Sequence, residues 1–274
     1  MEITLSERRG IPFYACTDPV WRSAAHGFST RLGGVSPAPW DSLNLGSSRG
    51  DAEDNVAENF RRFCAAVGTD SAALVKNRQV HGDLVRAAGP ADILSGPAAP
   101  GVREADGLIT DRPGVCLAVF SADCIPVLLH DPKRRVIAAV HAGWRGTALG
   151  IAARAAESMI RNYGCRPADI LAAIGPGISR CCFETHRDVP DGLRAGLGTE
   201  AEAFIHPLPG GEKFQVDLKG ANVRWLERAG LAPAHIAVCS ACTACQPRLF
   251  WSHRRLGERR GSMAAVIQLT GGPA

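Results

Sequence analysis

The chain has 274 residues, of which 46% are hydrophobic and 21% charged, and its net charge at pH 7 is +4. This composition is typical of a soluble globular protein with one large domain or two small ones. The basic residues occur in short pairs such as Arg134-Arg135, whereas a nucleic-acid-binding protein would carry a denser basic patch.

The N-terminal residues lack the apolar segment of a signal peptide, and no run of apolar residues approaches the roughly 18 that a membrane span requires. We therefore expect a cytoplasmic protein with neither a membrane nor a nucleic acid as partner, and a monomer or a weak homodimer. In a reducing compartment the ten cysteines are expected to be thiols or metal ligands rather than disulfides.

Hydrophobic periodicity predicts strands and helices in mixed order along the chain. A helix is expected at 54–67, where apolar residues recur with the helical period and Gly68 can end it. A second helix, capped by Thr147, is expected to run to Tyr163 and to end at Gly164. A third is expected at 218–229. Short apolar runs predict strands at 115–120, 125–129, 136–140, 170–174, 235–239 and 263–269.

The stretch 89–104 is rich in Pro, Gly and Ala and is predicted to be a surface loop. The sequence contains no internal repeat and no low-complexity linker. We therefore predict an α/β (α+β) fold, a single domain over 1–274 with a mixed β-sheet core flanked by helices.

Three residues at or just after predicted strands form a natural zinc-binding set. They are His81, Cys124 and His141. Their spacing differs from that of a zinc finger, whose ligands come in close pairs. Two imidazoles and one thiolate leave the fourth tetrahedral position open, which is typical of a catalytic metal. Each residue alone also has an ordinary structural explanation, since buried cysteines and hydrogen-bonded histidines are common.

Two neighbours of this set are further candidates. The Asp123 carboxylate is placed either to orient a ligand or to transfer a proton. Arg145, at the entry to a helix, suits phosphate or another anion, although a surface salt bridge would explain it equally well.

A second group of cysteines has the spacing C-x2-C-x2-C, at Cys239, Cys242 and Cys245. This spacing resembles part of an iron–sulfur or zinc motif, but the element that would complete it is missing. Whether these residues form a second metal site stays open at this point. The pair Cys181-Cys182 is expected to be buried.

Ordered motifs over about residues 24–269 give the chain a resemblance to a known family. It resembles the YfiH family, long labelled multicopper polyphenol oxidases or laccase-domain proteins. The matching segments are 26–36, 42–46, Gln79-Val80-His81-Gly82, 105–110, Ser121-Ala122-Asp123-Cys124, Val140-His141-Ala142-Gly143-Trp144-Arg145-Gly146, 174–178, Cys242-Thr243 and 250–255.

The resemblance implies a single α/β domain of mixed-sheet core and a zinc site, with copper as another possible ion, at His81, Cys124 and His141. It also implies phosphorolysis of adenosine, inosine, guanosine and 5'-methylthioadenosine, with adenosine deaminase activity. Bacterial members are further implicated in editing peptidoglycan precursors. This chain departs from the family pattern at 251–253 and 260–262, and it carries Cys239 and Cys245 in addition to the expected Cys242.

For a nucleoside and phosphate as substrates, the hypothesis assigns roles to the polar residues of these motifs. The catalytic residues would be Asp123, which would move the proton, together with Cys124 and Arg145. Phosphate and nucleoside would be bound with the help of Arg31, Asn44, Gln79 and Arg254.

Three alternatives remain at this point. A copper phenol oxidase would need many histidines, and this chain has eight with no H-x-H pair. A metal-free cysteine hydrolase would use Cys124 as nucleophile and His141 as base, which would suit amide cleavage in precursor editing. In a non-catalytic binding protein the metal would be structural.

Overall fold

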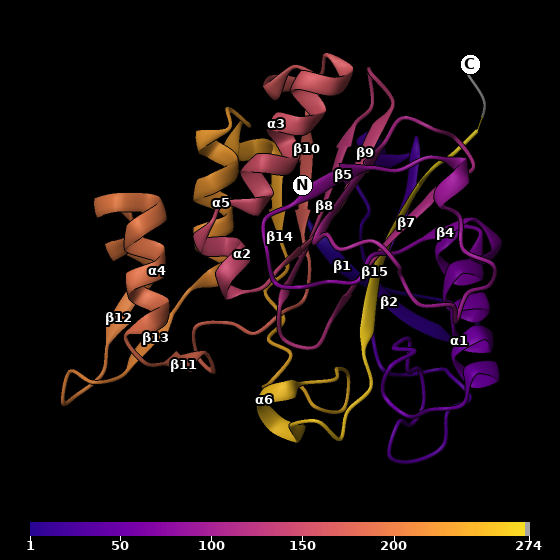
Figure 1. Cartoon of the computed structure of the whole chain (residues 1–274), viewed down its shortest axis with the longest axis horizontal. Helices are drawn as coiled ribbons and strands as arrows, with labels where there is room; N and C mark the ends of the chain where they lie inside the picture. The colour runs from indigo at the N-terminus through magenta and orange to yellow at the C-terminus, as the bar shows by residue number, and fades with distance from the viewer. Residues whose placement is uncertain (272–274) are drawn as a thin grey trace.

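Two six-stranded β-sheets form the centre of the computed structural model, which describes residues 1–271 (Figure 1). The first sheet has the order β1-β2-β3-β15-β7-β4. Its strands are β1 (Ile3–Arg8), β2 (Ile11–Cys16), β3 (Ala24–Ser29), β4 (Leu74–Val75), β7 (Cys116–Ser121) and β15 (Met263–Leu269). Its neighbouring strands are antiparallel except β4 and β7, so the sheet is mixed.

The second sheet has the order β14-β10-β8-β9-β6-β5 and is also mixed. Its strands are β5 (Val85–Ala87), β6 (Gly107–Thr110), β8 (Ile125–Asp131), β9 (Val136–Ala142), β10 (Leu171–Ile174) and β14 (Ile236–Val238). A small third sheet, β11-β13-β12, lies apart from these two. It consists of β11 (Glu184–Thr185), β12 (Ile205–Pro207) and β13 (Phe214–Val216).

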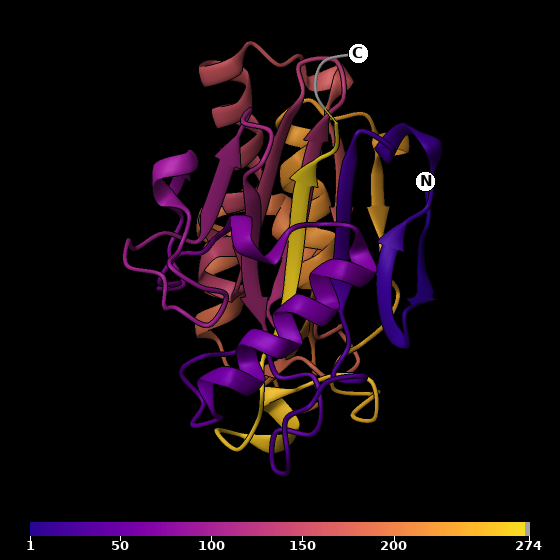
Figure 2. The same ribbon diagram turned by 90° about the vertical axis from the view of Figure 1, so that its right-hand side faces the viewer.

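Helices cover the outer faces of the paired sheets. One side carries α1 (Glu53–Val67), which lies across the first sheet in Figure 2. The other side carries the remaining larger helices, with the small sheet and α4 at its edge. These helices are α2 (Trp144–Ala148), α3 (Ile151–Tyr163), α4 (Asp188–Leu197) and α5 (Leu218–Arg228), while α6 (His253–Leu256) lies near the end of the chain. Short 3-10 helices occupy Pro19–Trp21, Ser71–Ala73, Pro90–Asp92, Pro167–Asp169, Gly198–Phe204 and Pro233–His235.

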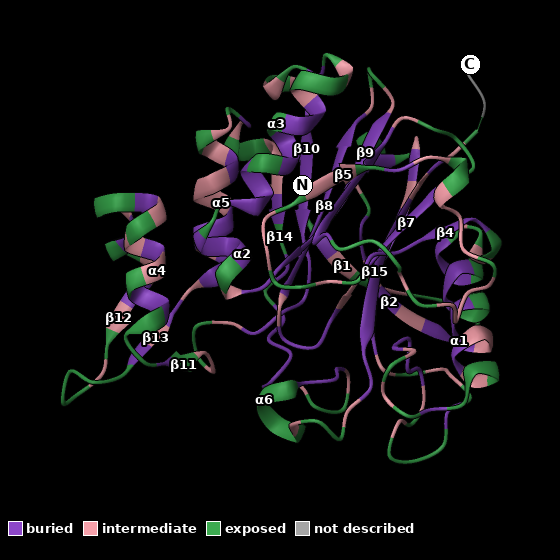
Figure 3. Ribbon diagram, in the orientation of Figure 1, coloured by how far each residue is buried: buried purple, intermediate pink, exposed green. Residues whose placement is uncertain are grey.

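The core is layered because side chains alternate between the two faces of each strand. On β8, Leu128 points into the apolar layer between the two sheets, whereas Val127 and Leu129 pack with the helices. Both β8 and β9 are buried along their whole length (Figure 3). This explains why they are continuous apolar runs rather than alternating patterns.

The predicted fold class is confirmed, and most predicted elements coincide with observed ones. The helix at 54–67 is α1, the helix at 218–229 is α5, and the predicted strands match β7, β8, β9, β10, β14 and β15. The sequence had not indicated that the sheet core divides into two facing sheets. It also gave no sign of the N-terminal strands β1 and β2, which pair in the first sheet.

Thr147 does not begin the helix that ends at Gly164. It lies inside the short helix α2, and its hydroxyl accepts a hydrogen bond from the Asn222 side chain at 2.9 Å. The chain then turns at Gly150, whose φ of 76° belongs to the left-handed region, and α3 starts at Ile151. A β-carbon at Gly150 would also lie 3.1 Å from the ring of Trp225.

Within residues 1–271, no helix has the length and apolar character required to cross a membrane.

Candidate metal centre and adjoining pocket

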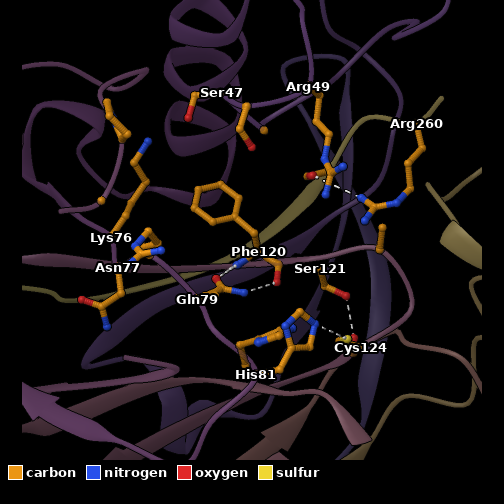
Figure 4. A pocket seen from close by; sticks show the side chains of 18 residues that line it. Ser47, Arg49, Lys76, Asn77, Gln79, His81, Phe120, Ser121, Cys124 and Arg260 are labelled. Atoms are coloured by element: carbon orange, nitrogen blue, oxygen red, sulfur yellow. Dashed lines mark hydrogen bonds between the residues drawn. The ribbon is translucent and has the colours of Figure 1, made fainter. Parts of the chain in front are cut away.

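Three chain segments bring His81, Cys124 and His141 together, as the sequence analysis predicted. His81 lies in the loop after β4, Cys124 in the turn between β7 and β8, and His141 on β9. Their candidate donor atoms all lie within 4.8 Å of one another. The Cys124 Sγ is 3.8 Å from the His81 Nε2 (Figure 4). The imidazole rings of His81 and His141 meet nearly edge to face, at an interplanar angle of 82°.

The buried carboxylate of Asp106 holds two of these ligands in place. Its Oδ1 lies 2.8 Å from the Nδ1 of His141, which leaves the Nε2 of that ring for an ion. The same carboxylate accepts hydrogen bonds from the backbone N–H groups of Val80, His81 and Gly82 at 2.8–3.1 Å. These bonds support the turn in which His81 adopts a φ of 61°, a conformation that non-glycine residues adopt only at an energetic cost.

Gly143 is required because the three ligands converge on it. A β-carbon at this position would lie 2.8 Å from the Cδ2 of His81 and 3.3 Å from the Sγ of Cys124. Any larger residue would push those side chains apart. The glycine of this motif therefore makes room for the ligand set.

Cys124 and His141 strongly affect each other's ionisation. Burial would by itself raise the pKa of Cys124, but His141 and His81 together lower the pKa of this thiol to about 6. Burial likewise opposes the charged form of His141, yet Cys124 and Asp106 raise the pKa of this imidazole to about 9. Near neutral pH, the protein without a metal thus holds a thiolate beside an imidazolium.

This donor set fits a single divalent ion. Two imidazole nitrogens and a thiolate are ligands that zinc accepts, and an ion bound by three protein ligands keeps one tetrahedral position for water or substrate. Copper accepts the same donor types, so this candidate donor set does not by itself identify the metal.

The three ligands open onto a cavity of about 400 Å³. Its wall contains four cationic side chains, Arg49, Lys76, Arg78 and Arg260, and the aromatic ring of Phe120. The other lining residues are Gly46, Ser47, Ser48, Asn77, Gln79, Pro100, Gly101, Ser121, Ala122 and Ser262. Pro100 and Gly101 belong to the predicted surface loop, which therefore borders the site.

Arg49 and Arg260 converge at one wall of this cavity (Figure 4). Burial, followed by repulsion from Arg49, lowers the pKa of Arg260, and the nearby Glu258 offsets this only in part. Glu258 itself accepts a hydrogen bond from Arg49 at 2.7 Å and is largely exposed. Two guanidinium groups that repel each other at a cavity wall form a favourable place for an anion.

Lys76 lines another part of the wall and is only 2% exposed. Its ammonium donates a hydrogen bond to the carbonyl oxygen of Pro97 at 2.7 Å and lies 4.9 Å from the ring centre of Phe60. Burial lowers the pKa of Lys76 to about 8. Its charge is therefore sensitive to pH just above neutrality.

Gln79, which was predicted to bind substrate, lines the pocket. Its side-chain amide is already hydrogen-bonded within the protein. Its amide donates to the carbonyl oxygen of Phe120 at 2.9 Å and accepts from the N–H of the same residue at 2.6 Å. Gln79 thus holds the aromatic residue of the pocket in position.

The carboxylate of Asp123 is hydrogen-bonded to three groups outside the candidate ligand set, and its role as a proton carrier stays a prediction. Its Oδ1 accepts from the hydroxyl of Thr243 at 2.6 Å, and its Oδ2 accepts from the hydroxyl of Ser252 at 3.0 Å and the N–H of Arg254 at 2.7 Å. Its φ of 95° is also unusual for a non-glycine residue. The geometry is that of a positioning residue, which ties the turn carrying Cys124 to the C-terminal loops.

Arg145, predicted to be catalytic, and Arg31 and Arg254, predicted to bind substrate, lie outside the lining of the pocket. Arg145 is exposed and stacks on the ring of Trp144 at 4.3 Å. Arg31 bonds to the backbone oxygens of Asp41 and Pro247 and lies over the ring of Trp251. The guanidinium of Arg254 donates to the carbonyl oxygen of Glu184.

Asn44 also has a structural position. It is fully buried, its amide donates to the Asp51 carboxylate at 3.0 Å, and its oxygen accepts from the N–H of Ser262 at 2.9 Å. Because Ser262 lines the pocket, Asn44 supports the wall from behind rather than reaching into the cavity.

Sequence reasoning did not identify Asp106, Arg49, Lys76, Arg260 or Phe120 as site residues. Asp106 lies in the quoted motif 105–110, directly before β6, and this position was the available signal. The three cations come from segments far apart in the sequence, so only the folded chain brings them together.

The whole fold matches solved structures. The crystal structure of the Bacillus licheniformis hypothetical protein YfiH superposes with a TM-score of 0.90 at 36% sequence identity, over 97% of this chain and 99% of that one. The fold of this chain is therefore one that a solved structure already shows.

The sequence comparisons agree. A Geobacillus stearothermophilus protein named purine nucleoside phosphorylase YlmD is 38% identical over 275 residues, which cover 97% of each chain. A Deinococcus radiodurans protein named purine nucleoside phosphorylase is 42% identical over 248 residues, or 89% of this chain and 88% of that one. Residues 25–270 match the family described as multi-copper polyphenol oxidoreductase laccase. The chain therefore belongs to this family, the YfiH family whose motifs the sequence had indicated.

Proposed function

We propose that this chain is a zinc-dependent purine nucleoside phosphorylase, which converts a purine nucleoside and inorganic phosphate into the free base and ribose 1-phosphate. Support comes from the names of its relatives in Geobacillus and Deinococcus. Further support comes from the pocket, which combines a three-ligand metal set with cationic and aromatic walls.

The observation that carries the proposal is the pair of guanidinium groups, Arg49 and Arg260, in the same cavity as the metal ligands. A guanidinium presents paired N–H donors that match the oxygens of phosphate. The ammonium of Lys76 adds a third positive charge. A phosphate dianion bound there would relieve the repulsion between the two arginines.

The second substrate, the nucleoside, requires a site for its planar base, and Phe120 is the proposed residue for it. Aromatic rings bind purines by stacking, which contributes roughly 1–3 kcal/mol per base in single-stranded nucleic-acid complexes. Gln79 fixes the backbone of Phe120. Ser47 and Ser48 supply hydroxyl groups for the ribose.

In this arrangement, phosphorolysis exchanges one bond for another at the anomeric carbon. A phosphate oxygen forms a bond to C1', the bond between C1' and the purine nitrogen breaks, and its electron pair leaves with the base, which takes up a proton. The arginines hold the attacking anion in place, so the reaction gains from proximity and orientation. A metal ion bound by His81, Cys124 and His141 would supply a Lewis acid at the edge of the same cavity.

The test is a nucleoside panel incubated with the zinc-loaded protein in the presence and absence of phosphate. Chromatography follows the free bases, and ribose 1-phosphate is measured separately. We expect base release from inosine, guanosine, adenosine and 5'-methylthioadenosine only with phosphate. Conversion of adenosine to inosine without phosphate would add the proposed deaminase activity. Base release that is independent of phosphate would contradict phosphorolysis.

A metal-free cysteine hydrolase is the second candidate, and one observation favours it. The pKa of Cys124 falls to about 6 beside an imidazolium, as in a nucleophilic cysteine pair. Alkylation with iodoacetamide separates the two functions. Under the phosphorylase proposal, zinc protects Cys124 from alkylation and activity requires zinc. Under the hydrolase alternative, the metal-free protein is the active form.

The same panel includes a copper-loaded sample and a phenolic substrate, because the family description names copper oxidases. Zinc is the proposed ion, since its preferred ligands match the set and it keeps one position open. Phenol oxidation with copper and no phosphorolysis with zinc would overturn this choice.

A further inference from the structure

Four cysteine thiols, none of them from the His-Cys-His set, lie close together in the folded chain. They are Cys181, Cys182, Cys242 and Cys245, and their sulfur atoms all lie within 4.8 Å of one another. The first two lie in the loop between β10 and β11, and the other two in the loop after β14. Cys239, the third residue of the C-x2-C-x2-C pattern, is outside this group and is buried in the core.

The predicted burial of Cys181 and Cys182 is wrong. Cys181 is exposed and Cys182 is intermediate. They supply the partners that the C-x2-C-x2-C pattern lacked. The sequence could not show this, because the two cysteine pairs lie about 60 positions apart and are joined only through the fold.

The separations between the sulfur atoms fit one tetrahedral ion. Thiolates at the usual zinc–sulfur distance of about 2.3 Å from a common centre lie about 3.8 Å apart. Here the Cys182 and Cys245 sulfurs are 3.3 Å apart, those of Cys181 and Cys245 3.5 Å, and those of Cys181 and Cys182 3.9 Å. In a four-iron cluster the cysteines bind separate iron atoms, which would require wider spacing.

The backbone around Cys242 favours a thiolate. The N–H of Ser179 donates to the Sγ of Cys242 at 3.3 Å, across the two loops. A thiolate sulfur bound to a metal accepts such N–H bonds, which orient the ligand. The backbone of one loop is thus arranged around the sulfur that the other loop supplies.

A buried cation lies beside the group. Lys219 is 5% exposed, and its ammonium donates to the carbonyl oxygens of Cys239 and Ala241 at 2.8 Å each. Burial lowers the pKa of Lys219, and the nearby thiols, Cys242 and Cys181 among them, act in the opposite direction. Four thiolates around a divalent ion carry a net charge of −2, which would compensate this ammonium.

We propose that Cys181, Cys182, Cys242 and Cys245 form a second, structural metal site, a closed tetrathiolate site for zinc. Zinc binding displaces the protons of the neutral thiols to solvent and forms four zinc–sulfur bonds, with no change of oxidation state. The ion joins the two loops, which also meet through a short β-bridge between Gly177 and Cys242 and through the Ser179–Cys242 hydrogen bond.

This site holds the loops that reach the catalytic side. The N–H of Ile178 donates to the carbonyl oxygen of Asp123 at 2.7 Å, and the hydroxyl of Thr243 donates to its carboxylate. Asp123 precedes the ligand Cys124. The tetrathiolate site therefore stabilises the support of the first metal site without contacting its pocket.

Metal analysis of the full chain, purified with zinc under reducing conditions, tests the proposal. We expect about two zinc ions per wild-type chain and about one after Cys181→Ser/Cys245→Ser. His81→Ala/Cys124→Ser is also expected to keep about one, and combining all four changes leaves none. The matched control Cys239→Ser, in the same loop but outside the group, keeps the wild-type content.

Cobalt gives a second readout that does not depend on activity. In the His81→Ala/Cys124→Ser background, a cobalt-loaded chain is expected to show the absorption of a tetrahedral thiolate complex. Its sulfur-to-cobalt charge-transfer band should fall when Cys245 alone is changed to Ser. Because Cys245 is exposed, we expect this variant to stay folded, which circular dichroism checks. Equal zinc content in wild type and Cys181→Ser/Cys245→Ser would overturn the proposal. A Cys182–Cys245 disulfide in the reduced preparation, found by peptide mass spectrometry, would overturn it as well.

Discussion

The two cysteine-containing centres of this protein differ in how many ligands they supply and in what surrounds them. The set of His81, Cys124 and His141 comes from the ends of three core segments and opens onto a cavity of about 400 Å³. The four-cysteine group comes from two loops and supplies four candidate thiolate ligands. Three ligands beside a cavity leave a position for chemistry, whereas four ligands close the coordination. One centre is thus suited to catalysis and the other to holding loops together.

Cys124→Ser tests the catalytic half of this comparison and has the largest expected effect. Phosphorolysis is expected to fall by about 1,000-fold or more, because a bound divalent ion contributes several kcal/mol of transition-state stabilisation. Base release under saturating nucleoside and phosphate measures it. Cys16→Ser, a buried thiol outside both centres, is the control and is expected to keep wild-type activity. If Cys124→Ser kept near-normal turnover after chelation, the metal mechanism would be wrong.

Cys181→Ser/Cys245→Ser is expected to show the opposite pattern. The free energy of unfolding should fall by several kcal/mol, because binding of a structural ion contributes directly to folding. Turnover per folded molecule should stay near wild type, since neither residue lines the pocket. Chemical denaturation with zinc and with a chelator measures the first quantity, and titrated active protein the second. If the chelator leaves the free energy of unfolding unchanged in both wild type and variant, the structural role of the ion is contradicted.

Asp106→Asn tests how the first centre is held. The carboxylate accepts four hydrogen bonds, three from backbone N–H groups and one from His141. An amide has only one acceptor oxygen, so its NH2 group would face donors. Metal affinity is expected to fall by about 10–100-fold, as for other supports of metal-bound histidines. Chelator competition measures the affinity. The control Asp83→Asn, on the loop that carries His81 but paired with Arg154, should bind metal normally.

Asp123→Asn separates positioning from proton transfer. The Asp123 carboxylate accepts from Thr243, Ser252 and Arg254, and we expect a loss of about 1–3 kcal/mol in stability when this pattern is broken. The dependence of kcat on pH should keep its shape. If the variant lost one limb of the pH profile while its stability stayed unchanged, the predicted role of Asp123 as a proton carrier would be supported.

The sequence predicted those features that depend on local pattern or on strand position. Buried strands such as β8 and β9 are continuous apolar runs, so their positions were evident. His81, Cys124 and His141 were identified because zinc-type donors at strand ends are unusual. Thr147 was misplaced because Gly150 divides one apparent helix into two, and a left-handed turn inside a helical pattern leaves only a glycine as signal.

Features that depend on distant contacts were not predictable in the same way. Arg31, Asn44 and Arg254 are polar residues in motifs, but in the folded chain their side chains bond to backbone or buried groups. Arg49 and Arg260 belong to distant segments, and only the fold places them in one wall. Residue type therefore predicted the candidate metal ligands that the fold brings together better than it predicted the residues that line the pocket. The chemistry of metal ligands is specific, whereas that of polar pocket residues is common to many structural roles.

The smallest expected effect comes from Lys76, a cationic residue in the wall of the pocket beside the first centre. Because burial lowers its pKa to about 8, Lys76 is protonated at neutral pH and loses its charge as pH rises through about 8. The KM for phosphate should therefore rise by up to about tenfold across this range, the loss of one charged contact. Lys76→Met, which suits the buried position, should have the higher KM already at pH 7 and no further rise near pH 8. The exposed control Lys133→Met should behave as wild type. An unchanged wild-type KM from pH 7 to 9 would place phosphate away from Lys76 and leave Arg49 and Arg260 as its site.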